Sequence, residues 1–484
     1  MKKPITLLAA AALGCGAAMA EGYQVNTLSA RQLGMGHTGI GMRLGAESMY
    51  FNPAGLTGLD KTLEIGGSVT AIMPSATATT LVGGKEKSYE TDCNASTPVN
   101  FNAAFSIFPN LKAGVSFYTP YGSSINWTRD WAGSVLSQDV NLKVYTVQPT
   151  IAWAITPKLS VGAGAMISWG SVDLNKGLVS ASTADKMLGL LQGLGQLPAG
   201  TPPFGETSPA SVNLTGTAQT AVGFNVGALY EFNDKWSVGA SYRSQMKMKV
   251  KAGDASVSYA NDLAQGLLSE SLDIINAANF KAEMPCPWVF GLGVTYKPVK
   301  GLVLAADARL TGWKAYKTLD IEFLNPSLES YNQHIAKNYH NSWTYSVGAQ
   351  YAFTKRLDGR LGLMIDTTPV SKTHYNPETP GMTKIEPTLG LSFRPLPDLS
   401  VDVAFMYIHG TGVKGASCSY PDLLGARLPS TISGMMQAQG IPAAAADAAA
   451  AAMCGNAGIT ASQTFTADYK LHAFAPSIGI SYRF

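Results

Sequence analysis

Four basic side chains in strand-like segments of this chain could hold a carboxylate. Alternation turns them away from the apolar side of their strands; they are Arg243, Lys247, Arg309 and Lys384. A cation without a saturated counter-ion binds an anionic group, and the planar guanidinium does so through two hydrogen bonds, so Arg243 and Arg309 are the first choices. The alternative is that these cations pair with Asp307, Glu386 and Asp402 and only brace the fold.

The residues that could catalyse a reaction or bind a metal form no recognisable set. The histidines are scattered, with no pair at metal-ligand spacing beside a third donor, so we predict neither a metal nor a cofactor. A lipolytic enzyme would need a serine and an acid or amide beside His409 or His472, which lie toward the outer ends of the last two strand-like segments. We therefore predict that the protein is not an enzyme, with lipolysis as the weaker alternative.

The carboxy terminus indicates which elements position these side chains. Its residues alternate and end on an aromatic side chain, as the closing strand of an outer-membrane β-barrel does. The side chains predicted to face lipid are Ile478, Ile480, Tyr482 and Phe484, and those predicted to face the lumen are Ser477, Gly479, Ser481 and Arg483.

The amino terminus predicts the same compartment. Two lysines precede an apolar run and Ala18-Met19-Ala20, so residues 1–20 are interpreted as a signal peptide removed on export to the bacterial outer membrane. The alternative is a lipoprotein acylated at Cys15. Because the compartment is oxidising, Cys418 and Cys454 could form a disulfide or remain two free thiols, and their spacing leaves both open.

The composition limits how the chain can cross a membrane. Only 14% of the residues are charged, the mean hydropathy is +0.07, and no apolar run of about 18 residues follows the leader, which excludes helical spans. A lipid-exposed backbone must hydrogen-bond within the protein, so a closed barrel is the remaining solution. The net charge of +3 and the lack of a basic run predict no nucleic-acid partner.

Alternating short and long connections predict fourteen strands. The short breaks are expected to be tight turns, at 108–112, 155–159, 232–236, 297–301, 353–359 and 394–399. The long connections lie near 74–97, 122–138, 175–210, 252–278, 322–340, 371–382 and 411–466. An even strand number returns both chain ends to the periplasmic side. The predicted fold class is therefore all-β, with a fourteen-stranded antiparallel transmembrane β-barrel over residues 61–484.

Residues 21–60 do not follow the strand pattern. They are rich in glycine, and a segment of this length before the first strand predicts a hatch, or plug, inside the lumen.

Three connections look helical instead. The segment 184–197 places Leu188, Leu191 and Leu194 on one side, and 261–277 does the same with Leu263, Leu267 and Ile274. The alanine-rich tract 443–452 predicts a third helix.

Several short motifs resemble one known family. They are Gly22-Tyr-Gln-Val-Asn26, Ser29-Ala30, Leu33-Gly34 and Asn52-Pro53-Ala54, and they lie between the leader and the strand pattern. In these the chain resembles the FadL family of outer-membrane transporters for long-chain fatty acids and other hydrophobic compounds. The resemblance implies a hatch, surface loops that capture ligand, and a kinked third strand that opens the wall sideways. The hatch and gating residues implied are Asn52, Pro53, Ala54, Pro120, Tyr121 and Gly122.

The third strand carries the residues that would produce such a kink. Pro120 lacks a ladder donor, and Gly122 permits unusual backbone angles. A spanning strand needs roughly 9 to 11 residues and fewer separate the preceding turn from Pro120, so we expect the break within the wall. The alternative is that both residues begin a surface loop.

The resemblance also implies partners. These are outer-membrane lipid and lipopolysaccharide around the barrel, and a hydrophobic small molecule such as a fatty acid, held by the loop leucines and by Arg243 and Arg309. It favours a monomer. The alternative function is a structural or adhesive barrel whose longest connection binds a partner.

Overall fold

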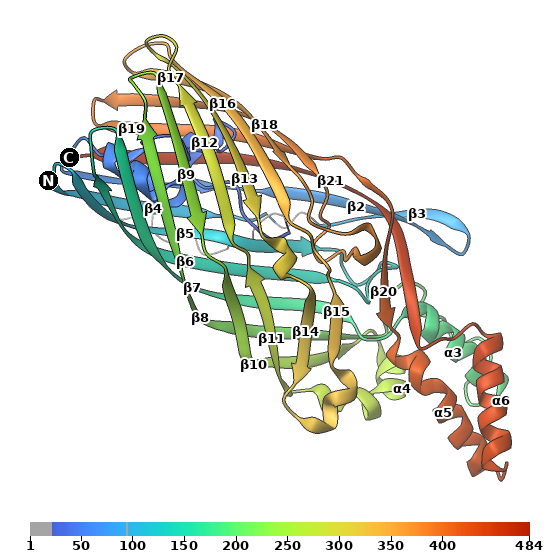
Figure 1. Ribbon diagram of the computed structural model, residues 1–484. Coiled ribbons are helices and arrows are strands. Elements are labelled where there is room, and N and C mark those ends of the chain that lie inside the picture. Colours follow the sequence, from blue (N-terminus) through green and yellow to red (C-terminus); the bar gives the residue numbers. More distant parts are fainter. Residues whose placement is uncertain (1–21, 93–94) are drawn as a thin grey trace, which may run out of the picture.

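The strands of the computed structural model close into one antiparallel barrel (Figure 1). The structure describes residues 22–92 and 95–484, so the predicted signal peptide and Cys15 lie outside the described residues. Strand β1 (Leu63–Thr70) pairs with β4 (Val99–Phe108) on one side and with β21 (Ser462–Arg483) on the other, which closes the ring. The prediction of fourteen transmembrane strands is confirmed over the described part of the chain.

Some strands run without interruption and others are broken near their outer ends. The uninterrupted ones, besides β21, are β5 (Leu111–Asn126), β6 (Asp139–Ala154), β7 (Leu159–Gly177), β8 (Ala210–Glu231), β17 (Leu357–Asp366) and β18 (Lys384–Leu396). The broken ones are β1 with β2 (Met73–Val82), β3 (Lys85–Glu90) with β4, β9 (Trp236–Arg243) with β10 (Met246–Tyr259), β11 (Asn279–Cys286) with β12 (Val289–Tyr296), β13 (Leu302–Thr311) with β14 (Thr318–Phe323), β15 (Gln333–Ala336) with β16 (Ser342–Ala352), and β19 (Leu399–Gly410) with β20 (Val413–Pro421).

The predicted tight turns all join neighbouring strands, but the first predicted long connection is wrong. Residues 74–97 contain β2 and β3, which pair as a hairpin around Gly83 and Gly84. Both glycines have positive φ, 58° and 78°, the backbone that a two-residue hairpin turn requires. The error arose because β2 extends beyond the membrane, where its outward side chains, Ser75, Thr77 and Thr79, are polar, so its sequence lacks the apolar alternation of a lipid-facing strand.

The two faces of the wall differ in exposure, as the alternation in the final strand predicted. Ile478 and Ile480 are 53% and 56% exposed, whereas Ser477 is 7% exposed. An outward cluster of Phe117, Tyr145 and Trp169, with ring centroids about 6 Å apart, lies on β5, β6 and β7. Aromatic side chains collect at the lipid–water boundary, so this cluster marks the outer edge of the apolar band.

Residues 22–60, called here the N-terminal segment, lie inside the ring of strands (Figure 1). The segment contains α1 (Ala30–Leu33), η1 (Gly45–Glu47), α2 (Ser48–Phe51) and η2 (Pro53–Gly58). Two wall glycines let it approach closely: a Cβ on Gly239 would lie 2.0 Å from the Ile40 carbonyl oxygen, and one on Gly227 would lie 2.1 Å from the Asn52 side chain. The segment therefore occupies the position expected of a plug, and its movement as a hatch stays a prediction.

Helices gather at the outer end of the barrel (Figure 1). They are α3 (Ala181–Gly193), α4 (Asp262–Leu272), α5 (Leu423–Ala438) and α6 (Ala443–Asn456), with short turns η3 (Asp273–Ile275), η4 (Trp313–Ala315), η5 (Pro326–Tyr331) and η6 (Lys372–His374). Three occur where they were predicted, with shifted ends. Helix α5 was missed because Pro429 and two glycines interrupt its pattern. Among the described helices, none combines the length and apolar character of a membrane span.

Of the two alternatives left open for Cys418 and Cys454, the structure has the two free thiols. Cys418 on β20 and Cys454 on α6 are both buried free thiols. Cys418 pairs across the ladder with Phe465, whereas Cys454 packs with Leu191, Leu428 and other residues of the surface helices. Sharing one long connection did not bring the two sulfurs together, because α5 and α6 fold into a unit of their own.

Candidate ligand-binding cavity and gate

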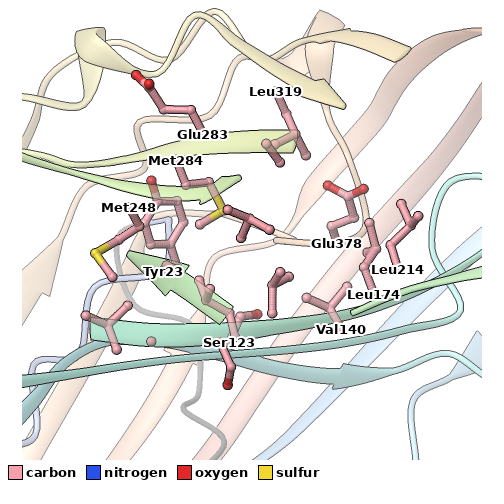
Figure 2. Close-up of a pocket in the computed structure, with 18 of the residues that line it drawn as sticks. Tyr23, Ser123, Val140, Leu174, Leu214, Met248, Glu283, Met284, Leu319 and Glu378 are labelled. Carbon is pink, nitrogen blue, oxygen red and sulfur yellow. The ribbon is translucent and has the colours of Figure 1, made fainter. Parts of the chain in front are cut away.

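An apolar cavity lies in the outer part of the barrel (Figure 2). The strands β6, β7, β8, β10, β11 and β14 each turn aliphatic side chains into it, including Leu142, Leu174, Leu214, Met248, Met284 and Leu319. The Glu283 carboxylate points away from these side chains in Figure 2 and pairs with lysines on the outer face. A cavity with this apolar lining suits a hydrophobic small molecule.

Tyr23 of the N-terminal segment forms one wall of the cavity. Its ring packs edge to face against Trp313, with centroids 4.8 Å apart, and against Tyr316, at 5.8 Å. Its hydroxyl donates to the carbonyl of Pro285 on β11. Because these contacts leave Tyr23 only 2% exposed, its ring is held firmly in place.

The backbone around Tyr23 also completes the ladder of the kinked strand. The pairing of β4 with β5 runs as far as Asn100 opposite Tyr118. Beyond that point the Gly122 amide donates to the Tyr23 carbonyl at 2.8 Å, and the Val25 amide donates to the Pro120 carbonyl at 2.9 Å. One short stretch of chain therefore contributes both a cavity wall and a partner for the strand.

The structure places Pro120, Tyr121 and Gly122 within β5, which continues to Asn126. The register between β5 and β6 shifts between Tyr118 and Tyr121, so the strand is bulged where Pro120 has no N–H to donate. The bulge lies beside the outward aromatic cluster, at the outer edge of the apolar band. Whether it opens as a gate stays a prediction.

Asn52, Pro53 and Ala54 fix the N-terminal segment to the wall. The Asn52 amide donates to the carbonyls of Ile40, at 2.8 Å, and of Ala228 on β8, at 3.0 Å. Its carbonyl oxygen accepts from the Ala54 amide at 3.1 Å and so caps η2, where Pro53 occupies the first position. The motif is thus a helix cap joined to a wall contact.

Replacing Asn52 with alanine should loosen this attachment. The cap and two donated hydrogen bonds are lost, at about 1 kcal/mol each, or about 2 to 3 kcal/mol together. We expect hydrogen exchange of the amides in 39–58 to accelerate by one to two orders of magnitude, with barrel amides unchanged. Asn52→Asp keeps the cap but turns a buried carboxylate oxygen toward the same two carbonyl oxygens, so it should give at least as large an effect. Unchanged exchange in both variants would mean that the contacts do not hold the segment.

Arg243 and Arg309 point inward, as predicted, but against the N-terminal segment. Arg243 donates to the Tyr50 carbonyl at 2.7 Å and lies over the Tyr50 ring at 4.3 Å. Arg309 contacts His37 Nδ1 at 3.1 Å. Burial, together with the Arg309 charge, lowers the pKa of His37 well below its usual range, which keeps the imidazole neutral as an acceptor. Neither arginine is among the described cavity-lining residues.

Two other predictions about basic residues differ in outcome. Lys384 is buried, as expected of an inward side chain. Lys247 was predicted inward and is exposed, because the break between β9 and β10 shifts the alternation by one residue. Asp402 was expected to pair with one of the four predicted cations. It pairs instead with Arg360, at 3.2 Å. Asp307 instead accepts the backbone amide of Gly39 at 2.7 Å.

The cation at the cavity itself was not predicted. Lys337, between β15 and β16, lines the cavity together with Glu378, and their charged atoms are 2.7 Å apart with both side chains nearly fully buried. Burial alone would lower the pKa of Lys337, but the Glu378 carboxylate raises it above its ordinary value. Lys176 on β7 donates a hydrogen bond to Gln333 at 2.6 Å and interacts electrostatically with Lys337 and Glu378. This charged cluster carries two lysines and one carboxylate.

The predicted loop leucines mostly hold the surface helices together. Leu188 is buried in the main core, and Leu191 is buried against α5 and α6. Leu194, Leu263 and Leu267 are partly buried beside these clusters, and Ile274 is 50% exposed. The described lining of the cavity includes none of the six. Their role in ligand capture stays a prediction.

His409 and His472 lie opposite each other in the ladder between β19 and β21. Both side chains are exposed on the outer face of the wall, where His409 stacks near Tyr407 and His472 lies beside Phe474. This position faces lipid rather than a catalytic pocket.

Comparison with known proteins agrees with this geometry. The model of a family described as outer membrane protein transport protein (OMPP1/FadL/TodX) matches residues 11–446. The chain is 26% identical over 433 residues to an outer-membrane protein of Neisseria meningitidis, covering 84% of this chain and 90% of that protein. It is 21% identical over 426 residues to the long-chain fatty acid transport protein of Escherichia coli K12, covering 84% and 92%.

Solved structures show the same fold. A FadL homologue of Pseudomonas aeruginosa superposes with a TM-score of 0.71 at 18% identity, covering 96% of this chain and all of the other. The Pseudomonas putida toluene transporter TodX gives 0.62 at 14% identity, covering 97% and 100%. The chain therefore belongs to the OMPP1/FadL/TodX family of transport proteins of the bacterial outer membrane.

Proposed function

We propose that this protein takes up hydrophobic molecules that carry one negative charge, with long-chain fatty acids as the expected class. The observation that carries the proposal is the apolar cavity with the Lys176–Lys337–Glu378 cluster beside it. Each methylene buried in the cavity contributes about 0.8 kcal/mol. A carboxylate buried with the chain requires a compensating cation, and this cluster has one positive charge in excess.

The head group is assigned to this cluster rather than to Arg243 and Arg309. Both arginines already donate to the N-terminal segment, and their loss should loosen that segment before it affects a ligand in the cavity. A relative that transports long-chain fatty acids supports the assignment, whereas the toluene transporter of the same fold has a neutral ligand. The charge of the ligand is therefore the property to test.

The proposed route runs from the outer helices through the cavity and out sideways at the bulge of β5. Ligand first contacts the helical end near α3 and α4, then fills the cavity beside Tyr23. Displacement of Tyr23 and Val25 frees the ladder edge of β5 at Pro120 and Gly122. Release into the bilayer keeps an apolar chain out of water. The protein acts as a monomer in this scheme, because each step uses one chain.

Lys176→Met should separate charged from neutral ligands. Removing the excess positive charge should weaken palmitate binding at least tenfold and leave methyl palmitate unchanged, because the apolar contacts remain. Isothermal titration of the detergent-purified protein measures both. Lys186→Met, which changes a lysine on α3 whose amine contacts the Gly458 carbonyl, is the matched control.

If Lys176→Met weakened the binding of palmitate and of methyl palmitate equally, the substitution would act through the shape of the cavity rather than through its charge. Unchanged binding of both would remove the head-group assignment. Wild-type protein that binds toluene and does not bind palmitate would replace a fatty acid with a neutral hydrocarbon as the ligand. Deleting 415–460 tests the adhesive alternative, which requires lost adhesion with unchanged uptake.

A further inference from the structure

Five lysines line a groove on the outer face of the barrel, on the strands above the membrane. They are Lys247, Lys249 and Lys251 on β10, Lys281 on β11 and Lys317 just before β14. We call this set the lysine patch. The carboxylates in the same groove are Glu283, Asp320 and Glu322, so positive charge is in excess. The groove and the ligand cavity lie on opposite faces of the same strands and share Val250, Ala282 and Glu283 in their linings.

The height of the patch above the membrane follows from the aromatic boundary. Tyr242 on β9 stacks on Trp288, which lies between β11 and β12, with centroids 6.5 Å apart, and the pair marks that boundary on this side of the barrel. Strands rise about 3.3 Å per residue and tilt by about 40°. Lys247 and Lys249 therefore lie roughly 10 to 20 Å beyond the boundary, at the depth of the sugars and phosphates of lipopolysaccharide.

The lysines are available to a new anion. Lys247 and Lys249 share Glu283, at 2.5 and 3.0 Å, and their side chains are more than half exposed. Exposed ion pairs contribute only about 0 to 1 kcal/mol, so an incoming phosphate can displace them. Among the described ion pairs, none involves Lys251 or Lys317.

The outer ends of β6 and β7 carry no comparable set of lysines among their described residues. There Asp139 faces Asn175 and Asn141 faces Asp173 across the ladder, and Lys143 lies opposite Gly122 of β5. A phosphorylated saccharide is therefore favoured on the side of β10, β11 and β14.

We propose that the lysine patch binds the phosphorylated inner saccharide of lipopolysaccharide and fixes the orientation of the barrel in the outer leaflet. The patch lies outside the ligand cavity, so this inference stands apart from the proposed uptake function.

Native mass spectrometry with purified rough-type lipopolysaccharide tests the proposal. The patch variant is Lys249→Gln, Lys281→Gln and Lys317→Gln in the full-length protein. The control is Lys85→Gln, Lys414→Gln and Lys470→Gln, which removes the same charge from exposed positions elsewhere on the outer part of the chain. We expect at least a tenfold weaker lipopolysaccharide affinity in the patch variant and an unchanged affinity in the control. Raising the salt concentration should weaken wild-type binding.

A second lipid separates charge from acyl-chain contact. The same lipopolysaccharide stripped of phosphate should bind wild type and the patch variant equally weakly. Equal affinity of the two proteins for the intact lipid would overturn the proposal, as would undiminished binding of the dephosphorylated lipid. Palmitate binding by the patch variant should match wild type, which shows that the barrel is folded and that the cavity is independent of the patch.

Discussion

Ala218→Trp is expected to abolish tight ligand binding while the barrel still assembles. Ala218 on β8 is 9% exposed and lines the cavity opposite Gly170. An indole in its place would occupy the space of several methylenes of the ligand. Losing three or four of them, at about 0.8 kcal/mol each, costs about 3 kcal/mol and weakens binding by about a hundredfold.

The neighbouring residue provides a matched control. Thr217 is exposed on the opposite face of the same strand, so Thr217→Trp adds the same side chain outside the cavity. Titration of the purified proteins with palmitate should show loss in the first variant only. If Ala218→Trp binds as tightly as wild type, the ligand is held elsewhere and the assignment of the cavity fails.

Gly122→Arg is expected to reduce cellular uptake to background. The residue lies where the β4–β5 ladder has ended and the N-terminal segment supplies the hydrogen-bond partner of β5. The arginine would place a charged guanidinium on the path of an apolar ligand leaving the wall. Removing this charge from water costs several kcal/mol. Uptake of labelled palmitate by cells that lack other uptake routes measures the effect.

Gly122→Ala is the control, because it adds a methyl group without a charge and should keep most of the uptake. Heat-modifiable migration on gels verifies that both variants are folded in the membrane. Binding of palmitate to purified Gly122→Arg should stay near the wild-type value, since the cavity is unchanged. Normal uptake by this variant would exclude the sideways route and direct attention to a path past the N-terminal segment.

The sequence predicted the elements whose surroundings impose a pattern. Inside the bilayer one face of each strand meets lipid, so the final strand shows a clear alternation of Ile478 and Ile480 with Ser477. The tight turns were predicted because short polar breaks interrupt that alternation. Beyond the membrane the outward side chains no longer meet lipid and are polar, so the pattern no longer distinguishes strand from loop, as β2 and β3 show.

The charged residues of the site were predicted less well. Lys337 and Glu378 lie in segments predicted as long connections, where sequence gives no direction for a side chain, and they meet only through the closed fold. Lys247 was misplaced by one interruption of a strand, since a single extra residue reverses every later side chain. Arg309 was placed on the correct face, but its contact with His37 depends on how the N-terminal segment folds.

The attachment of Tyr23 and Val25 to β5 sets how often this part of the wall is open. Their two backbone hydrogen bonds contribute about 1 kcal/mol each, and the aromatic contacts of Tyr23 about 0.5 to 1.5 kcal/mol each. Together these place a released state roughly 3.5 to 6.5 kcal/mol above the closed one, so that between roughly three molecules in a thousand and two in a hundred thousand have the segment detached at any moment. An empty barrel therefore stays shut nearly all the time, and only a ligand that binds the released state more tightly can change that population.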